Sequence, residues 1–300
     1  MRNNNNQEEM FKISAARRKF SLILFIAVVL ASGWIGVLAD SKLPEQPAEN
    51  SLGMGLWLIL PIIAMLVLRL VNCDWKDIGV LPNFKGNVKW YIAAIAIYPV
   101  MTVIVVGLAL MFNSASISDV ELNSILSLIG VSIAGNFIKN IFEEFAWRGY
   151  LTPKLIELKL NDWMLYLVSG LVWALWHAAY YMVFLPDSYF ETSSRMGFLL
   201  IGCVLMVAWS VMYVEIYRLT KSVWPCVLMH ALEDGVPTLL LSVAGVITLT
   251  KTGELWLSPT TGIITTVLFV GFGLWLRSIR MKKERKVNSE VSNGNNAVAS

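Results

Sequence analysis

Apolar residues fall in eight long runs along this 300-residue chain, and short polar segments separate them. An α-helix needs roughly 20 mostly apolar residues to cross the hydrocarbon core of a bilayer, and each run approaches or exceeds that length. The pattern therefore predicts an all-α, polytopic membrane bundle of about eight transmembrane helices. The predicted spans are residues 20–39, 52–71, 90–112, 124–147, 163–185, 196–217, 223–247 and 259–276.

The polar segments divide the chain into three parts. Residues 1–19 form a polar, basic N-terminal tail, and residues 20–276 form a single transmembrane helical domain. Residues 277–300 form a basic tail whose Asn- and Ser-rich end is predicted to be disordered. Within the domain, residues 151–162 are predicted to form a short helix at the membrane interface.

The first apolar run has two interpretations. Its basic flank and the small residues before Asp40 fit a cleaved signal peptide. A run of about 20 residues, however, exceeds the usual signal core of about 7–15 residues, which favours a retained first helix.

Charged residues alternate between the connecting segments. Lys and Arg concentrate in both tails and after the second, fourth and sixth spans, whereas the other connections are short, neutral or acidic. By the positive-inside rule, this distribution predicts that both termini lie in the cytoplasm. We expect the membrane to be that of a bacterial cell.

Composition supports a membrane protein. Hydrophobic residues make up 56% of the chain, charged residues 15%, and the mean hydropathy is +0.62, which is too apolar for an ordinary soluble domain. The net charge of +3 is modest and nothing indicates nucleic acid binding, so the expected partners are membrane lipids and a substrate. The three cysteines have neither pairing nor metal-ligand spacing, and we expect them to be reduced.

Ionisable side chains within the predicted spans are the candidate chemistry, because a charge at membrane depth is costly unless it is paired or hydrated. The fourth span ends in Glu143, Glu144 and Arg148. Glu144 and Arg148 lie one helical turn apart and can pair, either as a structural ion pair or with a direct catalytic role. Glu143 points about 100° away and has no obvious partner on its own helix, which makes it the candidate catalytic carboxylate.

Both histidines of the chain also fall within predicted spans, His177 on the fifth and His230 on the seventh. Histidine needs hydrogen-bond partners in hydrocarbon and exchanges protons near neutral pH. Trp173 precedes His177 by one turn, and Asp234 follows His230 by one turn. Each histidine alone is typical of a hydrogen bond between helices. Together with Glu143 they supply a base and donors for amide hydrolysis, provided that helices four, five and seven share one wet cavity.

Two further acids within the predicted spans are not assigned catalytic roles. Glu233 lies beside Asp234 and either is an extra acid in the pocket or faces a neighbouring helix, so it is expected at most to support the site from behind. Glu215 lies near the end of the sixth span with Arg218 three residues later, so this pair is expected to reach out to the interface.

The ordered motifs resemble a known family. EEFAWR is an EExxxR motif, WALWH places a histidine four residues after a tryptophan, and HALED supplies His-xxx-Asp. Over about residues 75–247, they resemble the CAAX-protease and bacteriocin-processing (Abi) intramembrane peptidases, whose eukaryotic members remove the last three residues from prenylated proteins. The resemblance implies a peptide or lipid-modified protein tail as substrate. It also implies catalytic roles for Glu143, His177, His230 and Asp234, supported by Glu144, Arg148 and Trp173.

Asp234 departs from the family pattern, because asparagine is common at that position. An ionised carboxylate would repel an oxyanion, so Asp234 must be protonated, orient His230 or bind a metal. The motifs by themselves establish no cofactor. A metal-dependent alternative has Zn²⁺ bound by Glu143, His177 and His230, with Asp234 either as a further ligand or supporting the ligands from behind.

A second class of function uses the same polar cavity without proteolysis. In this alternative, the chain is a membrane immunity or scaffold protein, or a proton-coupled carrier. Carriers often contain inverted repeats and broken helices at the bilayer midplane, and the sequence has neither.

Overall fold

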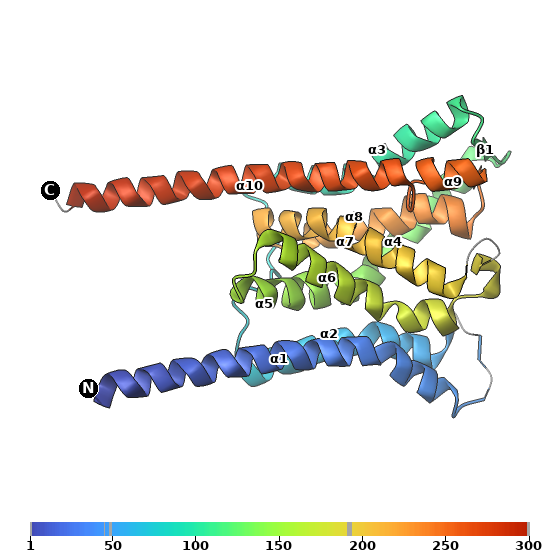
Figure 1. Ribbon diagram of the computed structural model, residues 1–300. Coiled ribbons are helices and arrows are strands. Elements are labelled where there is room, and N and C mark those ends of the chain that lie inside the picture. The colour runs from blue at the N-terminus through green and yellow to red at the C-terminus, as the bar shows by residue number, and fades with distance from the viewer. Residues whose placement is uncertain (1, 45, 48–49, 191–193, 299–300) are drawn as a thin grey trace. The chain divides into compact units, whose positions relative to one another are not determined.

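The computed structural model describes residues 2–44, 46–47, 50–190 and 194–298, which are almost entirely helical (Figure 1). Within these residues, eight helical segments are long and apolar enough to span a membrane. They begin and end within four residues of the predicted spans, except that the fourth continues to Glu157 and the eighth to Glu290. The prediction of an all-α, polytopic membrane protein is confirmed.

The structure divides this helical chain as follows. The α-helices are α1 Arg2–Asp40, α2 Leu52–Asn72, α3 Val88–Met111, α4 Leu122–Ala146, α5 Thr152–Glu157, α6 Asp162–Trp176, α7 Arg195–Thr220, α8 Trp224–Glu233, α9 Lys251–Leu257 and α10 Ile263–Val298. Three π-helical segments are η2 Trp147–Leu151, η3 Tyr180–Phe184 and η5 Asp234–Val243, and η4 Asp187–Phe190 is a short 3₁₀ helix. Two short strands are β1 Ala115–Ile117 and β2 Ile247–Leu249.

Three local features differ from the sequence prediction. The helix continues without a break from α4 through η2 into α5, so α5 is not a separate interfacial helix. Helix α10 extends to Val298 across most of residues 277–300, whose end was predicted to be disordered. The strands β1 and β2 were not predicted, because each has only three residues.

The chain forms two compact units. The first unit comprises Met1–Val80 and Ile138–Val207, and the second comprises Leu81–Phe137 and Ala208–Ser300. Helices α4 and α7 each begin in one unit and end in the other.

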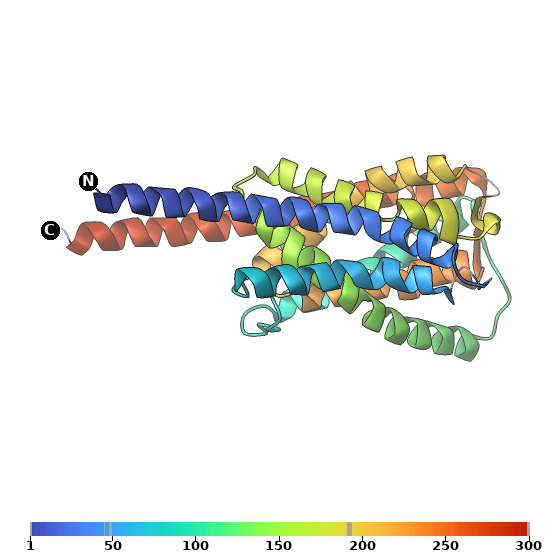
Figure 2. The same ribbon diagram turned by 90° about the horizontal axis from the view of Figure 1, so that it is seen from below.

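In the first unit, α1 and α2 form a hairpin whose helices lie side by side (Figure 1; Figure 2). Gly36 and Gly53 lie where the two helices approach most closely, and a Cβ at either position would overlap the backbone of the other glycine. Asp40 closes the hairpin, because its Oδ1 accepts a hydrogen bond of 2.7 Å from the backbone N–H of Gly53.

A buried arginine connects this hairpin to η2. Arg69 of α2 has none of its surface exposed, and its Nε donates to the carbonyl oxygen of Gly149 at 3.1 Å. Its Nη1 contacts Asp77 Oδ1 at 2.8 Å, and Lys154 of α5 contacts Asp74 Oδ2 at 2.5 Å. These charges stabilise the packing of α2, the following loop and the η2–α5 segment.

In the second unit, β1 and β2 pair in antiparallel register, with Ala115 opposite Leu249 and Ile117 opposite Ile247. Beside this small sheet, Val105, Ala109 and Leu257 form a buried apolar cluster that joins α3 to α9. The sheet therefore closes the end of the unit where the chain leaves α3 and enters α9.

The expected position of Glu215 was wrong. Glu215 of α7 is fully buried instead of reaching the interface. Its charge is compensated there by Arg280 of α10, which pairs with both carboxylate oxygens at 2.6 and 3.1 Å. Arg218, the partner expected from the sequence, lies farther away at 3.5 Å. Arg280 also contacts Glu284 at 2.9 Å, so the network stabilises the packing of α10 on α7.

We predict that Glu215→Gln lowers the free energy of unfolding by about 3–5 kcal/mol, because it removes the buried carboxylate and leaves Arg280 only the contact with Glu284, whose side chain is 54% exposed. Thermal unfolding of the detergent-solubilised protein measures this change. The control is Glu254→Gln, which makes the same substitution on the exposed surface of α9. Equal unfolding temperatures for the two variants would show that the pair contributes nothing to stability.

A second prediction concerns Asp74, which lies in the loop after α2. Burial raises the pKa of its carboxyl, but the hydrogen bond and charge of Lys154 and the charge of Arg69 outweigh burial and lower the pKa below its ordinary value. The stabilisation is therefore complete above the unfolded-state pKa of about 3.9 and is lost as the pH falls through the lower folded-state pKa. Asp74→Asn should destabilise the protein at neutral pH, and this difference in unfolding temperature should shrink below about pH 4. A difference that is independent of pH would contradict this account.

Candidate active site

The EExxxR motif lies at the junction of α4 and η2, in the first unit. Glu143 is 3% exposed, and Glu144 and Arg148 have no exposed surface. The Arg148 Nη1 lies 2.9 Å from Glu144 Oε1, so the pair predicted from the one-turn spacing is present. A buried ion pair at this depth fixes the end of α4, because separating it would leave two uncompensated charges in an apolar interior.

Glu143 has a cation on its own helix, contrary to the sequence prediction. The Lys139 Nζ lies 3.6 Å from Glu143 Oε1. Lys139 precedes Glu143 by one turn, and its side chain is 36% exposed, so it reaches the carboxylate from the surface of the unit. The charge of the buried Glu143 is therefore partly compensated.

Trp173 connects the EExxxR motif to His177. The guanidinium carbon of Arg148 lies 4.7 Å from the centre of the Trp173 ring, a cation–π contact between η2 and α6. The carbonyl oxygen of Trp173 lies 2.9 Å from Nδ1 of His177. Trp173 thus contacts both motifs: its ring contacts Arg148, and its backbone carbonyl contacts His177.

This contact determines the tautomer of a neutral His177. A carbonyl oxygen only accepts hydrogen bonds, so Nδ1 must carry the proton and donate it. The lone pair is then on Nε2, the nitrogen that can accept a proton from water or hold a water molecule. His177 is half-buried at the C-terminal end of α6.

Aromatic rings hold the imidazole in place. Trp57 of α2 and Trp176 stack with centroids 4.2 Å apart, and each indole N–H donates to the backbone carbonyl of the other, at 3.0 and 3.3 Å. The ring of His177 lies 4.6 Å from that of Trp176 and 5.5 Å from those of Trp57 and Tyr181. The sequence gives no indication of Trp57, because it lies 119 positions before Trp176.

A π-helical segment overlaps the end of two motifs and begins shortly after the third. Segment η2 contains Arg148, η3 begins three residues after His177, and η5 begins at Asp234. Widened helical turns of this kind occur frequently at functional sites, where they redirect side chains. Periodicity in the sequence did not predict them.

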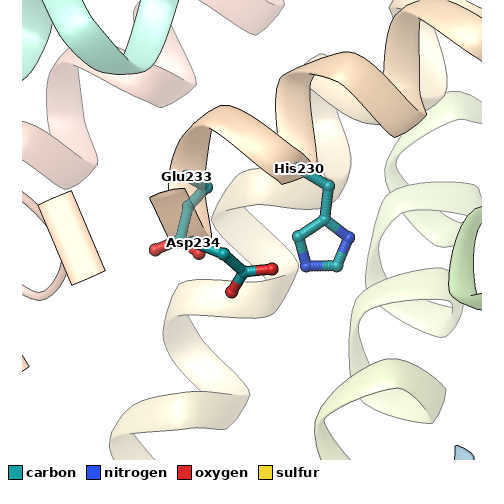
Figure 3. A group of neighbouring side chains, drawn as sticks. All are labelled: His230, Glu233 and Asp234. Carbon is teal, nitrogen blue, oxygen red and sulfur yellow. The ribbon is translucent and has the colours of Figure 1, made fainter. Parts of the chain in front are cut away.

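His230, Glu233 and Asp234 form a group in the second unit (Figure 3). One ligand atom from each residue lies within 4.8 Å of those of the other two. His230 and Glu233 are each 5% exposed, and Asp234 is half-buried. Glu233 therefore lies close to both His230 and Asp234.

Packing fixes both sides of this group. The Tyr213 ring of α7 lies edge-on to His230, with centroids 5.9 Å apart. Next to Asp234, Gly235 packs so closely on Ile133 of α4 that a Cβ would overlap the Ile133 side chain. Figure 3 shows the Asp234 carboxylate directed toward the imidazole of His230.

The predicted site residues thus fall into two groups. Glu144, Arg148, Trp173 and His177 form a continuous series of contacts in the first unit, with Glu143 next to Glu144. His230 and Asp234 lie in the second unit. A cavity shared by both groups stays a prediction, as does the zinc site of Glu143, His177 and His230, because both draw on residues of the two units.

Comparison with known families agrees with these motifs. Residues 124–236 match the family model described as type II CAAX prenyl endopeptidase Rce1-like. The matched stretch contains all three motifs, from Glu143 to Asp234. A comparison with curated proteins finds no significant match. The resemblance predicted from the motifs is confirmed: residues 124–236 of this integral, multi-pass membrane protein match the model of the Rce1-like type II CAAX prenyl endopeptidases.

Proposed function

We propose that this protein is an intramembrane endopeptidase that hydrolyses a peptide bond in a peptide or lipid-modified protein tail. The family match supports CAAX-type endopeptidase activity in general. The observation that carries the residue assignment is the series of contacts from Glu144 through Arg148 and Trp173 to His177, which joins two motifs in one packed group.

In the proposed reaction, Glu143 and His177 activate water. The Glu143 carboxylate takes a proton from a water molecule that Nε2 of His177 holds by accepting its other hydrogen. The oxygen of that water attacks the carbonyl carbon of the scissile bond, which forms a tetrahedral intermediate with a negative oxygen. Glu144 is held in its ion pair with Arg148, so we assign the proton transfer to the neighbouring carboxylate, Glu143.

The second half of the reaction assigns His230 to the oxyanion. An N–H of its imidazole donates to the developing negative oxygen, and Asp234 orients the ring. Glu143 then gives its proton to the amide nitrogen, the C–N bond breaks, and the products are a carboxylic acid and an amine. Water supplies the oxygen and both hydrogens that the products gain.

We infer from charge distribution that both termini face the cytoplasm of a bacterial cell. Lys and Arg concentrate in the two tails and after the second, fourth and sixth spans. The Rce1-like family acts on peptide or prenylated protein substrates in membranes, so we expect the substrate tail to enter from that side.

The first functional prediction is that Glu143→Gln lowers the cleavage rate by about 10²- to 10⁴-fold, because the amide cannot accept the proton of water. Mass spectrometry of membrane peptides, from cells with the wild type or the variant, identifies and quantifies the products. Glu254→Gln, the same change at an exposed position of α9, should cleave normally.

Retention of full activity in Glu143→Gln would refute the assignment. If instead no cleavage occurs with the wild type, and a cellular effect such as immunity survives both Glu143→Gln and His230→Ala, the chain acts as a scaffold.

The next prediction concerns the contact between Arg148 and Trp173. Arg148→Lys keeps the charge opposite Glu144 but loses the planar stacking on the indole, a contact worth about 1–2 kcal/mol when it is desolvated. We expect a lower unfolding temperature and a slower cleavage rate, with Arg285→Lys at an exposed position of α10 as the control. A variant with wild-type stability and rate would show that the contact does not position the site.

A further inference from the structure

A small pocket lies between three helical segments of the first unit, apart from the candidate active site. Its enclosed part has a volume of about 20 Å³, which is room for about one water-sized group, and its whole volume with the open mouth is about 260 Å³. Each of α1, α2 and the η2–α5 segment contributes one cation and one neutral hydrogen-bonding side chain to the lining. In chain order these residues are Arg18, Ser21, Arg69, Asn72, Tyr150 and Lys154.

Positive charge predominates in and around the pocket. Asp74 is the one carboxylate among the described residues of the lining, and Lys154 already holds it at 2.5 Å. Outside the lining, Asp77 and Glu157 also contact these cations, while Arg17 and Lys19 flank Arg18 on the surface of α1. Five cations therefore face three carboxylates, and the excess is positive.

Tyr150 supplies the observation that points to a ligand. Its side chain is 2% exposed and lines the pocket, and its ring packs on Phe25 with centroids 4.6 Å apart. In the part of the chain that the structure describes, no residue forms a hydrogen bond with its hydroxyl. A buried phenol usually has such a partner. The Tyr150 hydroxyl is therefore a donor for a molecule that enters the pocket.

Ser21 offers a second hydroxyl donor. It is 7% exposed, and its Oγ accepts a hydrogen bond of 3.1 Å from Nδ2 of Asn72. The same nitrogen donates to the carbonyl oxygen of Leu68 at 2.7 Å, so the amide is held in place. Because the Ser21 oxygen serves as the acceptor, its own hydrogen remains for donation to a ligand.

The pocket lies at the boundary between hydrocarbon and lipid headgroups. Ser21 is the second residue of the first predicted span, Asn72 is the last residue of α2, and Tyr150 follows the fourth predicted span by three positions. The start of the first span and the ends of the second and fourth meet the same side of the membrane, where the basic connections lie. Beside the pocket, Phe20 is 65% exposed and Val71 is 60% exposed, so lipid reaches this surface.

We propose that this pocket binds the phosphate group of an anionic phospholipid. Cations that converge with O–H donors suit phosphate oxygens, and basic pockets between transmembrane helices bind anionic headgroups. One phosphate oxygen enters the enclosed part toward Tyr150, and the rest of the group lies at the mouth beside Arg18. A phosphate held in this way joins α1, α2 and η2–α5, so it stabilises the first unit whether or not the chain is a protease.

The experiment measures binding of phosphatidylglycerol to the detergent-solubilised full chain by native mass spectrometry. Phosphatidylcholine with the same acyl chains is the reference, because its headgroup has no net charge. We expect one phosphatidylglycerol per chain, bound at least about 10-fold more tightly than phosphatidylcholine, and a rise in unfolding temperature when it is added. Inorganic phosphate is the third ligand tested, and a rise in unfolding temperature equal to that with phosphatidylglycerol would overturn the lipid as occupant.

Two variants test the pocket itself. Tyr150→Phe removes only the hydroxyl, so it should weaken phosphatidylglycerol binding about 10-fold without lowering the unfolding temperature of the lipid-free protein. Tyr189→Phe, the same change in η4, should bind like the parent protein. Arg18→Gln should weaken binding at least about 10-fold, whereas Lys19→Gln removes the same charge from outside the lining and should weaken it less than about 5-fold.

Three results would overturn the proposal. Equal losses in Arg18→Gln and Lys19→Gln would show that anionic lipid is attracted diffusely to the basic end of α1. Unchanged binding in both Tyr150→Phe and Arg18→Gln would show that the lipid binds elsewhere. Equal affinity for phosphatidylglycerol and phosphatidylcholine would show that the pocket does not recognise an anionic headgroup.

Discussion

The first unit depends on how a fully buried arginine is compensated. Arg148 has no exposed surface, and an isolated guanidinium in such a place would be strongly destabilising. Glu144 neutralises it at 2.9 Å, and the face of Trp173 accepts it at 4.7 Å. Because the Trp173 carbonyl also contacts Nδ1 of His177 at 2.9 Å, the same arrangement fixes the tautomer of the histidine. Compensation of one charge thus helps to position His177, one of the two residues assigned to water activation.

Buried charge connects helices elsewhere in the chain as well. Arg69 contacts the carbonyl of Gly149 from α2, which holds the backbone of η2 directly after Arg148. In the second unit, Glu215 and Arg280 bring α7 and α10 together. In both cases a buried charged side chain holds two segments together, because separating it from its partner would cost free energy. The group of His230, Glu233 and Asp234 differs, because it places two acids close to an imidazole on one helix.

The sequence predicts what depends on neighbouring positions along a helix. The eight apolar runs predicted the spans, and one-turn spacing predicted the Glu144–Arg148 pair and the contact of Trp173 with His177. Contacts between distant positions were missed, since Arg69 and Gly149 are 80 residues apart and Glu215 and Arg280 are 65 apart. The π-helical segments were missed as well, because they depend on packing that no local pattern records.

The central proposal is that His177 and His230 serve one hydrolytic reaction, as the family match across all three motifs supports. The most direct measurement is a double-mutant cycle on the cleavage rate, with His177→Asn from the first unit and His230→Asn from the second. Residues that act as a unit have strongly non-additive effects. The account predicts that the double variant is scarcely slower than the slower single variant, and rate losses that multiply independently would contradict it.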